Sequence, residues 1–312
     1  MTVALVTGAA GFVAQHLAPA LRNKGFTKIL GADIRPTRQG VFDASQVADL
    51  TVKSEMLRVV ESFAPDVVFH LAGLVNTFED SIRASNLDTA RHLIECVRET
   101  SPLTRIVLVG SAAEYGEVPL DRQPVEETFV GNPQGVYGKA KAAVSALASH
   151  AAAEDGLHVV VARPFNIIGP GVPSSLVVGA IVDRLRRTLA GPPPRSARIG
   201  KTTSIRDFVA VEDVVEGLIL AGERGKPGAA YNLCTGVGRS VAEVLAKLIL
   251  LTREGIEVEN DPSLVREMET NALVGSWRKS QLELDWSPHV QFDVSLRATW
   301  EASASEFANS IV

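Results

Sequence analysis

Several features that would assign a protein to a common class are scarce in this chain of 312 residues. Its two cysteines, Cys96 and Cys234, lie far apart and outside any Cys-x-x-Cys pair, so neither a disulfide framework nor a thiolate zinc site is predicted. The formal net charge of −5 argues against a basic surface for nucleic acid. No apolar run approaches about 18 residues, and the apolar start is too short for a signal peptide. We expect a cytoplasmic protein with no nucleic-acid or membrane partner.

Signatures of other enzyme classes are also missing. The six histidines show no metal-ligand spacing, so no metal site is predicted. Residues 200–202 read Gly-Lys-Thr, like the end of an ATP-binding loop, but Arg195 stands where the opening glycine is needed. Ser111 lacks the Gly-x-Ser-x-Gly setting of a hydrolase nucleophile.

The chain instead alternates short apolar runs with helix-like segments. Runs typical of buried strands are 3–6, 28–33, 66–70, 105–109, 157–162 and 230–233. Helices are predicted at 12–24, 54–63, 82–100, 137–154, 176–189, 209–221 and 240–252. This alternation indicates an α/β fold with a doubly wound parallel sheet of the Rossmann type.

Glycine and proline become frequent after residue 165 and predict a second, smaller domain. We expect a dinucleotide-binding domain over 1–165, to which about 206–236 returns. Residues 166–205 and 237–312 are then predicted to form a C-terminal α/β substrate domain.

A glycine-rich turn links the first predicted strand to the first helix. Gly8 and Gly11 let backbone amides approach a pyrophosphate at the amino end of the helix, and Ala14 replaces the third glycine of the usual fingerprint. Phe12 and Val13 follow in the same turn. The turn therefore predicts a dinucleotide cofactor.

Asp33 ends the second predicted strand 19 residues after Ala14, where a carboxylate reaches the ribose hydroxyls of adenosine. A carboxylate there favours NAD, whereas Arg35 and Arg38 could attract the 2′-phosphate of NADP, so the choice between NAD and NADP stays open. The further residues predicted to line the cofactor are Ile34, Asp49, Leu50, Leu71, Ala72, Gly73 and Pro164.

Tyr137 and Lys141 are four residues apart on a predicted helix and so share one face. A phenol can act as acid or base near neutral pH if a neighbouring ammonium stabilises the phenolate. Ser111 adds a hydroxyl for the substrate oxygen that gains or loses the proton. We predict these three residues as the catalytic group of a nicotinamide hydride-transfer site.

The sequence resembles the extended short-chain dehydrogenase/reductases that act on nucleotide sugars, over nearly its full length. The matching pieces are 7–14, 70–73, Asn86 with Thr89, 111–116, 137–141, 163–166, 169–171 and 206–209. The resemblance implies that Tyr137 is the general acid/base, that Lys141 holds the nicotinamide ribose and lowers the tyrosine pKa, and that Ser111 bridges to the sugar. It also implies that Asn166 and Arg206 face the substrate diphosphate.

Ala113 stands where the dehydratases of this superfamily carry an acidic residue, and the adjacent Glu114 is expected to point elsewhere, so a 4,6-dehydratase is disfavoured. The second half is most similar to reductases of GDP-4-keto-6-deoxymannose, which make GDP-rhamnose. That similarity adds Arg198 and Lys201 to the expected substrate contacts, with Lys201 in place of the asparagine expected in that subgroup.

Two other functions stay open at this point. A 4-epimerase with retained NAD+ would use the same three catalytic residues, and a non-catalytic dinucleotide sensor would have no use for them. Family members often pair the helices over 82–100 and 139–154 between subunits, so a homodimer is expected.

Overall fold

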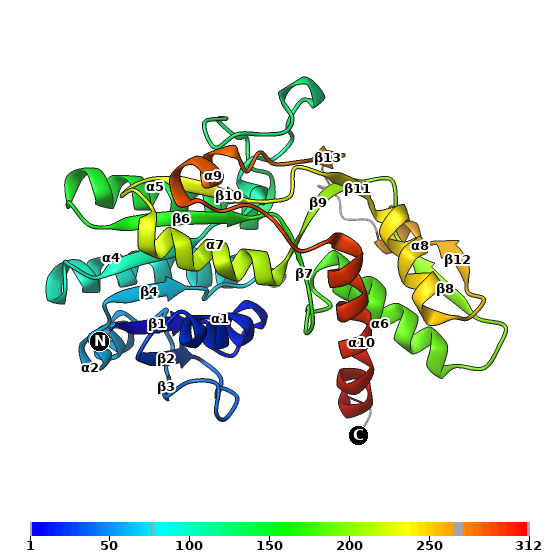
Figure 1. Ribbon diagram of the computed structural model, residues 1–312, viewed down its shortest axis with the longest axis horizontal. Helices are drawn as coiled ribbons and strands as arrows, with labels where there is room; N and C mark the ends of the chain where they lie inside the picture. Colours follow the sequence, from blue (N-terminus) through cyan, green and yellow to red (C-terminus); the bar gives the residue numbers. More distant parts are fainter. Residues whose placement is uncertain (1, 76–77, 265–270, 311–312) are drawn as a thin grey trace.

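The computed structural model describes residues 2–75, 78–264 and 271–310. Its larger part is a parallel sheet of seven strands, in the order β10-β6-β5-β4-β1-β2-β3 (Figure 1). The strands are β1 (Val3–Thr7), β2 (Lys28–Asp33), β3 (Ala44–Val47), β4 (Val67–His70), β5 (Arg105–Val109), β6 (Val159–Pro164) and β10 (Ala230–Leu233). This sheet confirms the predicted α/β class with a Rossmann-type arrangement.

Side chains alternate between the two faces of the sheet, and both faces are covered by helices. Ala4 and Val6 of β1 join one apolar core with α1 (Phe12–Asn23) and α7 (Val211–Arg224). Leu5 joins the other core, which the helices of the opposite face complete. Burial on both faces explains why the strands read as continuous apolar runs.

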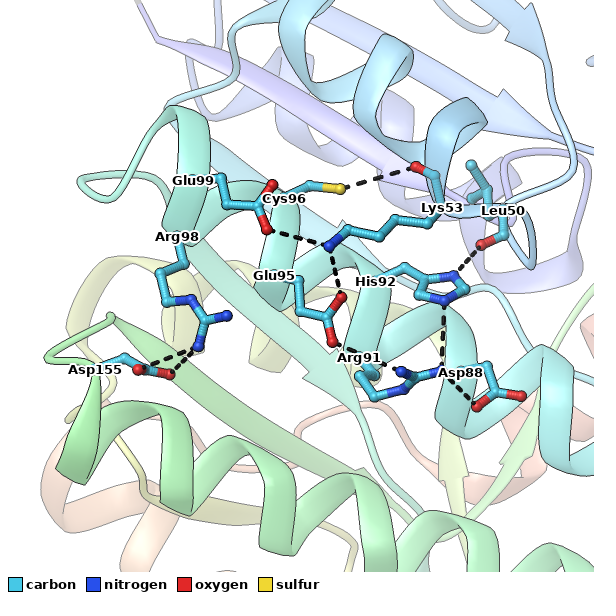
Figure 2. A network of polar contacts seen from close by, with 10 residues as sticks. All are labelled: Leu50, Lys53, Asp88, Arg91, His92, Glu95, Cys96, Arg98, Glu99 and Asp155. Atoms are coloured by element: carbon cyan, nitrogen blue, oxygen red, sulfur yellow. Dashed lines mark hydrogen bonds and ion pairs between the residues drawn. The ribbon is translucent and has the colours of Figure 1, made fainter.

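The helices of the second face are α2 (Lys53–Phe63), α4 (Thr89–Thr100) and α5 (Gly135–Glu154). Ion pairs connect them along their exposed side: Lys53 of α2 contacts Glu95 and Glu99 of α4, and Arg98 of α4 contacts Asp155 after α5 (Figure 2). These pairs are half-exposed, so each adds little to stability.

The predicted helix over 82–100 is not continuous. It consists of α3 (Glu79–Arg83), a π-helical turn η1 (Ala84–Asp88) and then α4. Such π turns are frequent at functional sites.

A smaller part, to the right in Figure 1, carries most of the remaining elements. Strands β7 (Asn166–Ile168), β9 (Ile205–Ala210), β11 (Gly238–Ser240) and β13 (Ala272–Leu273) form one sheet, and β8 (Ser196–Ile199) pairs with β12 (Glu257–Asn260). Helices α6 (Val177–Ala190), α8 (Val241–Thr252) and α10 (Phe292–Ser310) enclose its core, and α9 (Arg278–Leu284) lies against α7 and β10. Short 3-10 turns occur at Ala112–Glu114, Leu120–Arg122 and Pro262–Leu264.

The segment expected to return to the large sheet divides between the two parts. Helix α7 and strand β10 do pack on or join that sheet, but β9 belongs to the smaller sheet. The helix predicted from residue 209 begins at Val211, because Val209 and Ala210 are the buried end of β9.

Two charged side chains cover the β10 edge of the large sheet. The Glu127 carboxylate accepts a hydrogen bond from the Asn232 N–H, and the Lys279 ammonium donates to the Ala230 carbonyl. Such contacts protect an edge strand against pairing with another chain. Among the described residues, no helix is both long and apolar enough to cross a membrane.

Candidate active site

The glycine-rich turn lies where β1 ends, and its geometry requires glycine. Gly8 has φ +67°, and a Cβ there would lie 2.8 Å from both the Ala72 nitrogen and the Leu71 carbonyl carbon. Gly11 caps α1, with no side-chain cap among the described residues, so the first amides of the helix remain available. Open amides at a helix amino terminus bind phosphate groups well.

Asp33, at the end of β2, is bonded to this turn. Its carboxylate accepts hydrogen bonds from the Ala10 and Arg35 N–H groups, both at 2.9 Å, and the Arg35 guanidinium lies 3.7 Å away. The side chain of the adjacent Ile34 is 64% exposed. The residues expected at the adenosine end therefore do lie beside the turn.

His70 connects the ends of β1 and β4 under the turn. Its Nδ1 is 2.8 Å from the Thr7 hydroxyl and its Nε2 is 3.1 Å from the Thr89 hydroxyl. Burial lowers the pKa of His70 to about 3, and the Lys141 charge adds to this effect. The imidazole is therefore neutral and serves as a hydrogen-bonded bridge.

Leu71, Ala72 and Gly73 follow β4 and pass against Gly8 and Asn86. The Asn86 amide nitrogen, in the π turn, donates to the carbonyls of Leu74 and Ile82, while its Oδ1 is buried with no partner among the described residues. A buried acceptor without a donor is costly, so this oxygen is suited to a hydrogen bond from a ligand.

The other predicted cofactor residues lie at the same edge of the sheet. Asp49 and Leu50 follow β3: the Asp49 carboxylate accepts hydrogen bonds from Thr51, and Leu50 is buried in the core. Pro164 is the buried last residue of β6. Phe12 and Val13 open α1 and pack against the core.

The structure brings the three predicted catalytic residues together. Ser111 lies two residues after the end of β5, and its hydroxyl interacts with the Tyr137 phenol on α5, lowering the pKa of that phenol. The Lys141 ammonium lies 5.8 Å from the Tyr137 ring centre and donates to the Val109 carbonyl at 2.7 Å. Because β1 and β5 are parallel strands of one sheet, Ser111 after β5 lies at the same edge of the sheet as the glycine-rich turn after β1.

The phenol differs from the expectation of a lowered pKa. Burial raises the pKa of Tyr137 to about 12, and the Ser111 hydrogen bond offsets this only partly. Burial also lowers the pKa of Lys141 to about 8. At neutral pH the phenol therefore holds its proton, which is the form that donates.

Glu114 points away from the place of the dehydratase acid, as expected, but the reason differs from the one given by the sequence. The segment after Ser111 is a 3-10 turn and not extended, so the Glu114 carboxylate turns back and accepts from the Ser111 N–H at 2.8 Å. The Ser111 hydroxyl oxygen in turn accepts from the Ala113 N–H. This is a capping box, and the spacing Ser-x-x-Glu is its sequence signal.

The predicted substrate contacts divide into two groups. Asn166 and Arg206 lie on paired strands of one sheet: the Asn166 amide donates to the Asp207 carbonyl, and the Arg206 guanidinium donates to the Ile205 carbonyl. Arg239, which sequence reasoning missed, lies directly opposite Arg206 across β11 and β9.

Arg198 and Lys201 belong to the other group, in and after β8. The side chain of Arg198 is 70% exposed and forms an ion pair with Asp261 at 3.0 Å, and the Lys201 ammonium donates to Asn271. Both cations therefore have partners that a ligand would have to displace.

The residues present fit a dinucleotide. A turn that admits no Cβ at Gly8, the open amides of α1, the Asp33 carboxylate and the unpartnered Asn86 oxygen lie along one edge of the sheet. The turn and the helix amides suit the phosphates of such a cofactor, the Asp33 carboxylate suits its ribose, and the Asn86 oxygen suits a polar donor.

Comparisons with known proteins agree with this geometry. The family model described as NAD dependent epimerase/dehydratase family matches residues 4–234. The chain is 28% identical over 309 residues to the GDP-6-deoxy-D-mannose reductase of Pseudomonas aeruginosa, covering 96% of this chain and 98% of that protein.

Two solved structures extend the similarity. RMD from Pseudomonas aeruginosa complexed with NADPH has a TM-score of 0.84 at 26% identity, with 98% of this chain and 100% of that chain covered. UDP-glucose 4-epimerase from Thermus thermophilus in complex with NAD has a TM-score of 0.84 at 26% identity, with 96% and 98% covered. Since the family model spans most of the sequence, this chain belongs to the NAD dependent epimerase/dehydratase family and is an NAD(P)-dependent enzyme of the extended short-chain dehydrogenase/reductase type.

Proposed function

We propose that this protein is an NAD(P)H-dependent reductase of a nucleotide-linked 4-keto-6-deoxy sugar, of the type that converts GDP-4-keto-6-deoxymannose to GDP-rhamnose. The observation that carries the proposal is the Ser111–Tyr137–Lys141 group beside the glycine-rich turn. The similarity to the Pseudomonas reductase over nearly the whole chain supports the sugar class.

In this proposal each catalytic residue has one role. Tyr137 gives its proton to the C4 oxygen of the sugar, Ser111 holds that oxygen through its hydroxyl, and the Lys141 ammonium binds the nicotinamide ribose. Bound NADH or NADPH supplies the hydride. At neutral pH the phenol holds its proton, which is the form that a ketone being reduced requires.

We further propose that the two parts of the chain bind different ligands. Residues 1–165, together with β10 and α7, bind the dinucleotide, and 166–205 with 237–312 bind the nucleotide sugar. Asn166 and Arg206 contact the diphosphate, where a guanidinium can form two parallel hydrogen bonds to phosphate oxygens. Arg198 and Lys201 take part at the nucleotide end after releasing Asp261 and Asn271.

The test is the absorbance of the reduced nicotinamide after addition of GDP-4-keto-6-deoxymannose, with NADH and NADPH in parallel. Oxidation in step with product formation is expected from one of the two cofactors. The reductase would be rejected if no 4-keto sugar led to oxidation of NADH or NADPH. If the protein also converted a UDP-hexose without net redox change, a 4-epimerase, the second candidate, would be the better assignment.

That second candidate is a nucleotide-sugar 4-epimerase with retained NAD+, which the similarity to the Thermus epimerase favours. It predicts NAD+ bound to the purified protein. A non-catalytic sensor, the third candidate, predicts dinucleotide binding without turnover of either substrate.

We also propose a homodimer built on α4 and α5. The outward row of α5 is small and exposed at Ala146, Ser149 and Ala153, while the exposed side of α4 carries the ion pairs shown in Figure 2. Light scattering at micromolar concentration is expected to give the mass of two chains, and Ala146→Arg to give one. A cytoplasmic location is proposed as well, since Cys96 and Cys234 are buried free thiols.

A further inference from the structure

We propose that Glu114 is a positioning residue, whose buried carboxylate fixes Ser111 in the donor orientation. This inference rests on the proposed function for its kinetic part only.

The first argument is the number of hydrogen bonds that meet at Glu114. The side chain is buried, with one oxygen accepting from the Ser111 N–H at 2.8 Å. The other accepts from the Ser145 hydroxyl at 2.5 Å and the Arg163 Nε at 2.8 Å. The carboxylate thereby joins the loop after β5, helix α5 and strand β6 at one point.

The second argument concerns the Ser111 hydroxyl. Within the same capping box its oxygen accepts from the Ala113 N–H at 3.1 Å. A hydroxyl oxygen accepts through two lone pairs and donates one proton. With one lone pair used in the turn, the proton is directed away from it, toward the phenol of Tyr137 and the sugar oxygen expected there.

The third argument is electrostatic. The groups that face Glu114 are Arg163 from β6, Lys141 from α5, and the phenols of Tyr115 and Tyr137. Arg163 is held by Glu114 and by the Tyr115 hydroxyl. The negative charge of Glu114 opposes the effect of burial on Lys141, whose pKa is nevertheless lowered to about 8. Loss of that charge lowers it further.

A cavity of about 440 Å³ lies behind this network and supplies a matched control. Glu127 lines the same cavity, also accepts from a backbone N–H, that of Asn232, and also lies near Arg163. Within the described residues, Glu127 contacts none of the three catalytic residues. Glu114 and Glu127 thus differ mainly in which backbone N–H group the carboxylate binds, that of Ser111 or that of Asn232.

The experiment compares Glu114→Gln with Glu127→Gln in the full-length protein. Glu114→Gln is expected to lower kcat on the order of 10- to 100-fold with KM nearly unchanged, because a misplaced hydroxyl affects the chemical step. In Glu114→Gln the Lys141 ammonium is expected to titrate at a lower pH than in the parent protein. This titration is followed by NMR of 13Cε-labelled lysine, with the Lys141 signal assigned from Lys141→Met. Glu127→Gln is expected to change neither property.

Glu114→Asp separates the two effects. The shorter side chain keeps the charge but cannot reach Ser111 and Arg163 together, so kcat falls while the Lys141 titration stays close to that of the parent. If Glu114→Gln does not fold, Glu114→Asp takes its place in the kinetic comparison.

The proposal requires the fall in kcat in the glutamine variant and its absence in Glu127→Gln. An unchanged kcat in Glu114→Gln, or an equal fall in both variants, overturns it. If the parent oxidises no NAD(P)H with any keto sugar, the proposed function fails, but the Lys141 titration still decides the electrostatic role of Glu114.

Discussion

The cofactor side and the substrate side of the candidate site are built in different ways. On the cofactor side, His70, Asp33 and Glu114 are nearly buried, and each is bonded to two or more neighbours. On the substrate side, Arg198 is mostly exposed and its partner is a single carboxylate. The residues of the cofactor side are held in place by the protein itself, whereas under the proposed function Arg198 exchanges its ion pair for a contact with the nucleotide sugar.

Removing the phenol should give the largest effect. Tyr137→Phe keeps the ring and deletes the proton donor, so kcat is expected to fall about 10²- to 10⁴-fold. Cofactor affinity should stay within a factor of about two, because the glycine-rich turn is untouched. Turnover is measured by nicotinamide absorbance and binding by NADPH fluorescence. Full activity in this variant would mean that another group supplies the proton.

The rigidity of the cofactor side can be tested at Gly8. Gly8→Ala places a Cβ within 2.8 Å of the backbone of Leu71 and Ala72 at φ +67°. Gly156 is the matched control, since its φ is also +67° but nothing lies within 4 Å. The left-handed conformation alone costs about 1–2 kcal/mol. Both variants should lose that much stability by urea unfolding.

Only Gly8→Ala should also lose cofactor affinity, by at least about tenfold, since the turn must shift. Equal NADPH affinities in the two variants would show that this turn does not hold the pyrophosphate.

His70 makes the same side sensitive to acid. Its pKa is about 3 in the folded protein and about 6.5 when unfolded, so between these values the unfolded chain binds the proton more readily. The contribution of this residue to stability is therefore complete above pH 6.5 and is lost on acidification toward pH 3. At pH 5 the loss amounts to about 2 kcal/mol.

His70→Asn is expected to be less stable than the parent at pH 7 but to lose about 2 kcal/mol less between pH 7 and pH 5. Unfolding in urea at both pH values measures this, with the exposed His150→Asn as control. A parent-like loss in His70→Asn would mean that other groups cause the acid sensitivity.

The sequence predicted the parts of the fold whose side chains are buried on both faces. Strand β3 was missed because its edge position leaves Ala44 and Ser45 exposed, so no apolar pattern marks it. The π turn was missed because Asn86 acts through the carbonyls of Leu74 and Ile82, one of them distant along the chain. Local periodicity does not encode such contacts.

The candidate site divides in a similar way. The catalytic residues could be identified from spacing and resemblance, since a helix brings Tyr137 and Lys141 to one face. The raised pKa of Tyr137 could not be predicted, because it depends on burial by segments far apart in sequence. The orientation of Glu114 could have been predicted from its capping box, had the turn been expected in place of an extended segment.

The smallest effects are expected on the substrate side, where Arg206 and Arg198 can be compared. Arg206→Lys keeps the charge but loses the planar donor pair, so KM for the nucleotide sugar should rise about tenfold at constant kcat. Arg198→Lys should change KM less than about threefold, because an exposed ion pair contributes little and the Arg198 side chain is 70% exposed. If both substitutions raise KM equally, Arg198 releases Asp261 when the substrate binds. Its contact with the nucleotide is then as strong as the contact of Arg206 with the diphosphate. If neither does, the cations that recognise the substrate lie elsewhere, and Arg239 opposite Arg206 is the first to test.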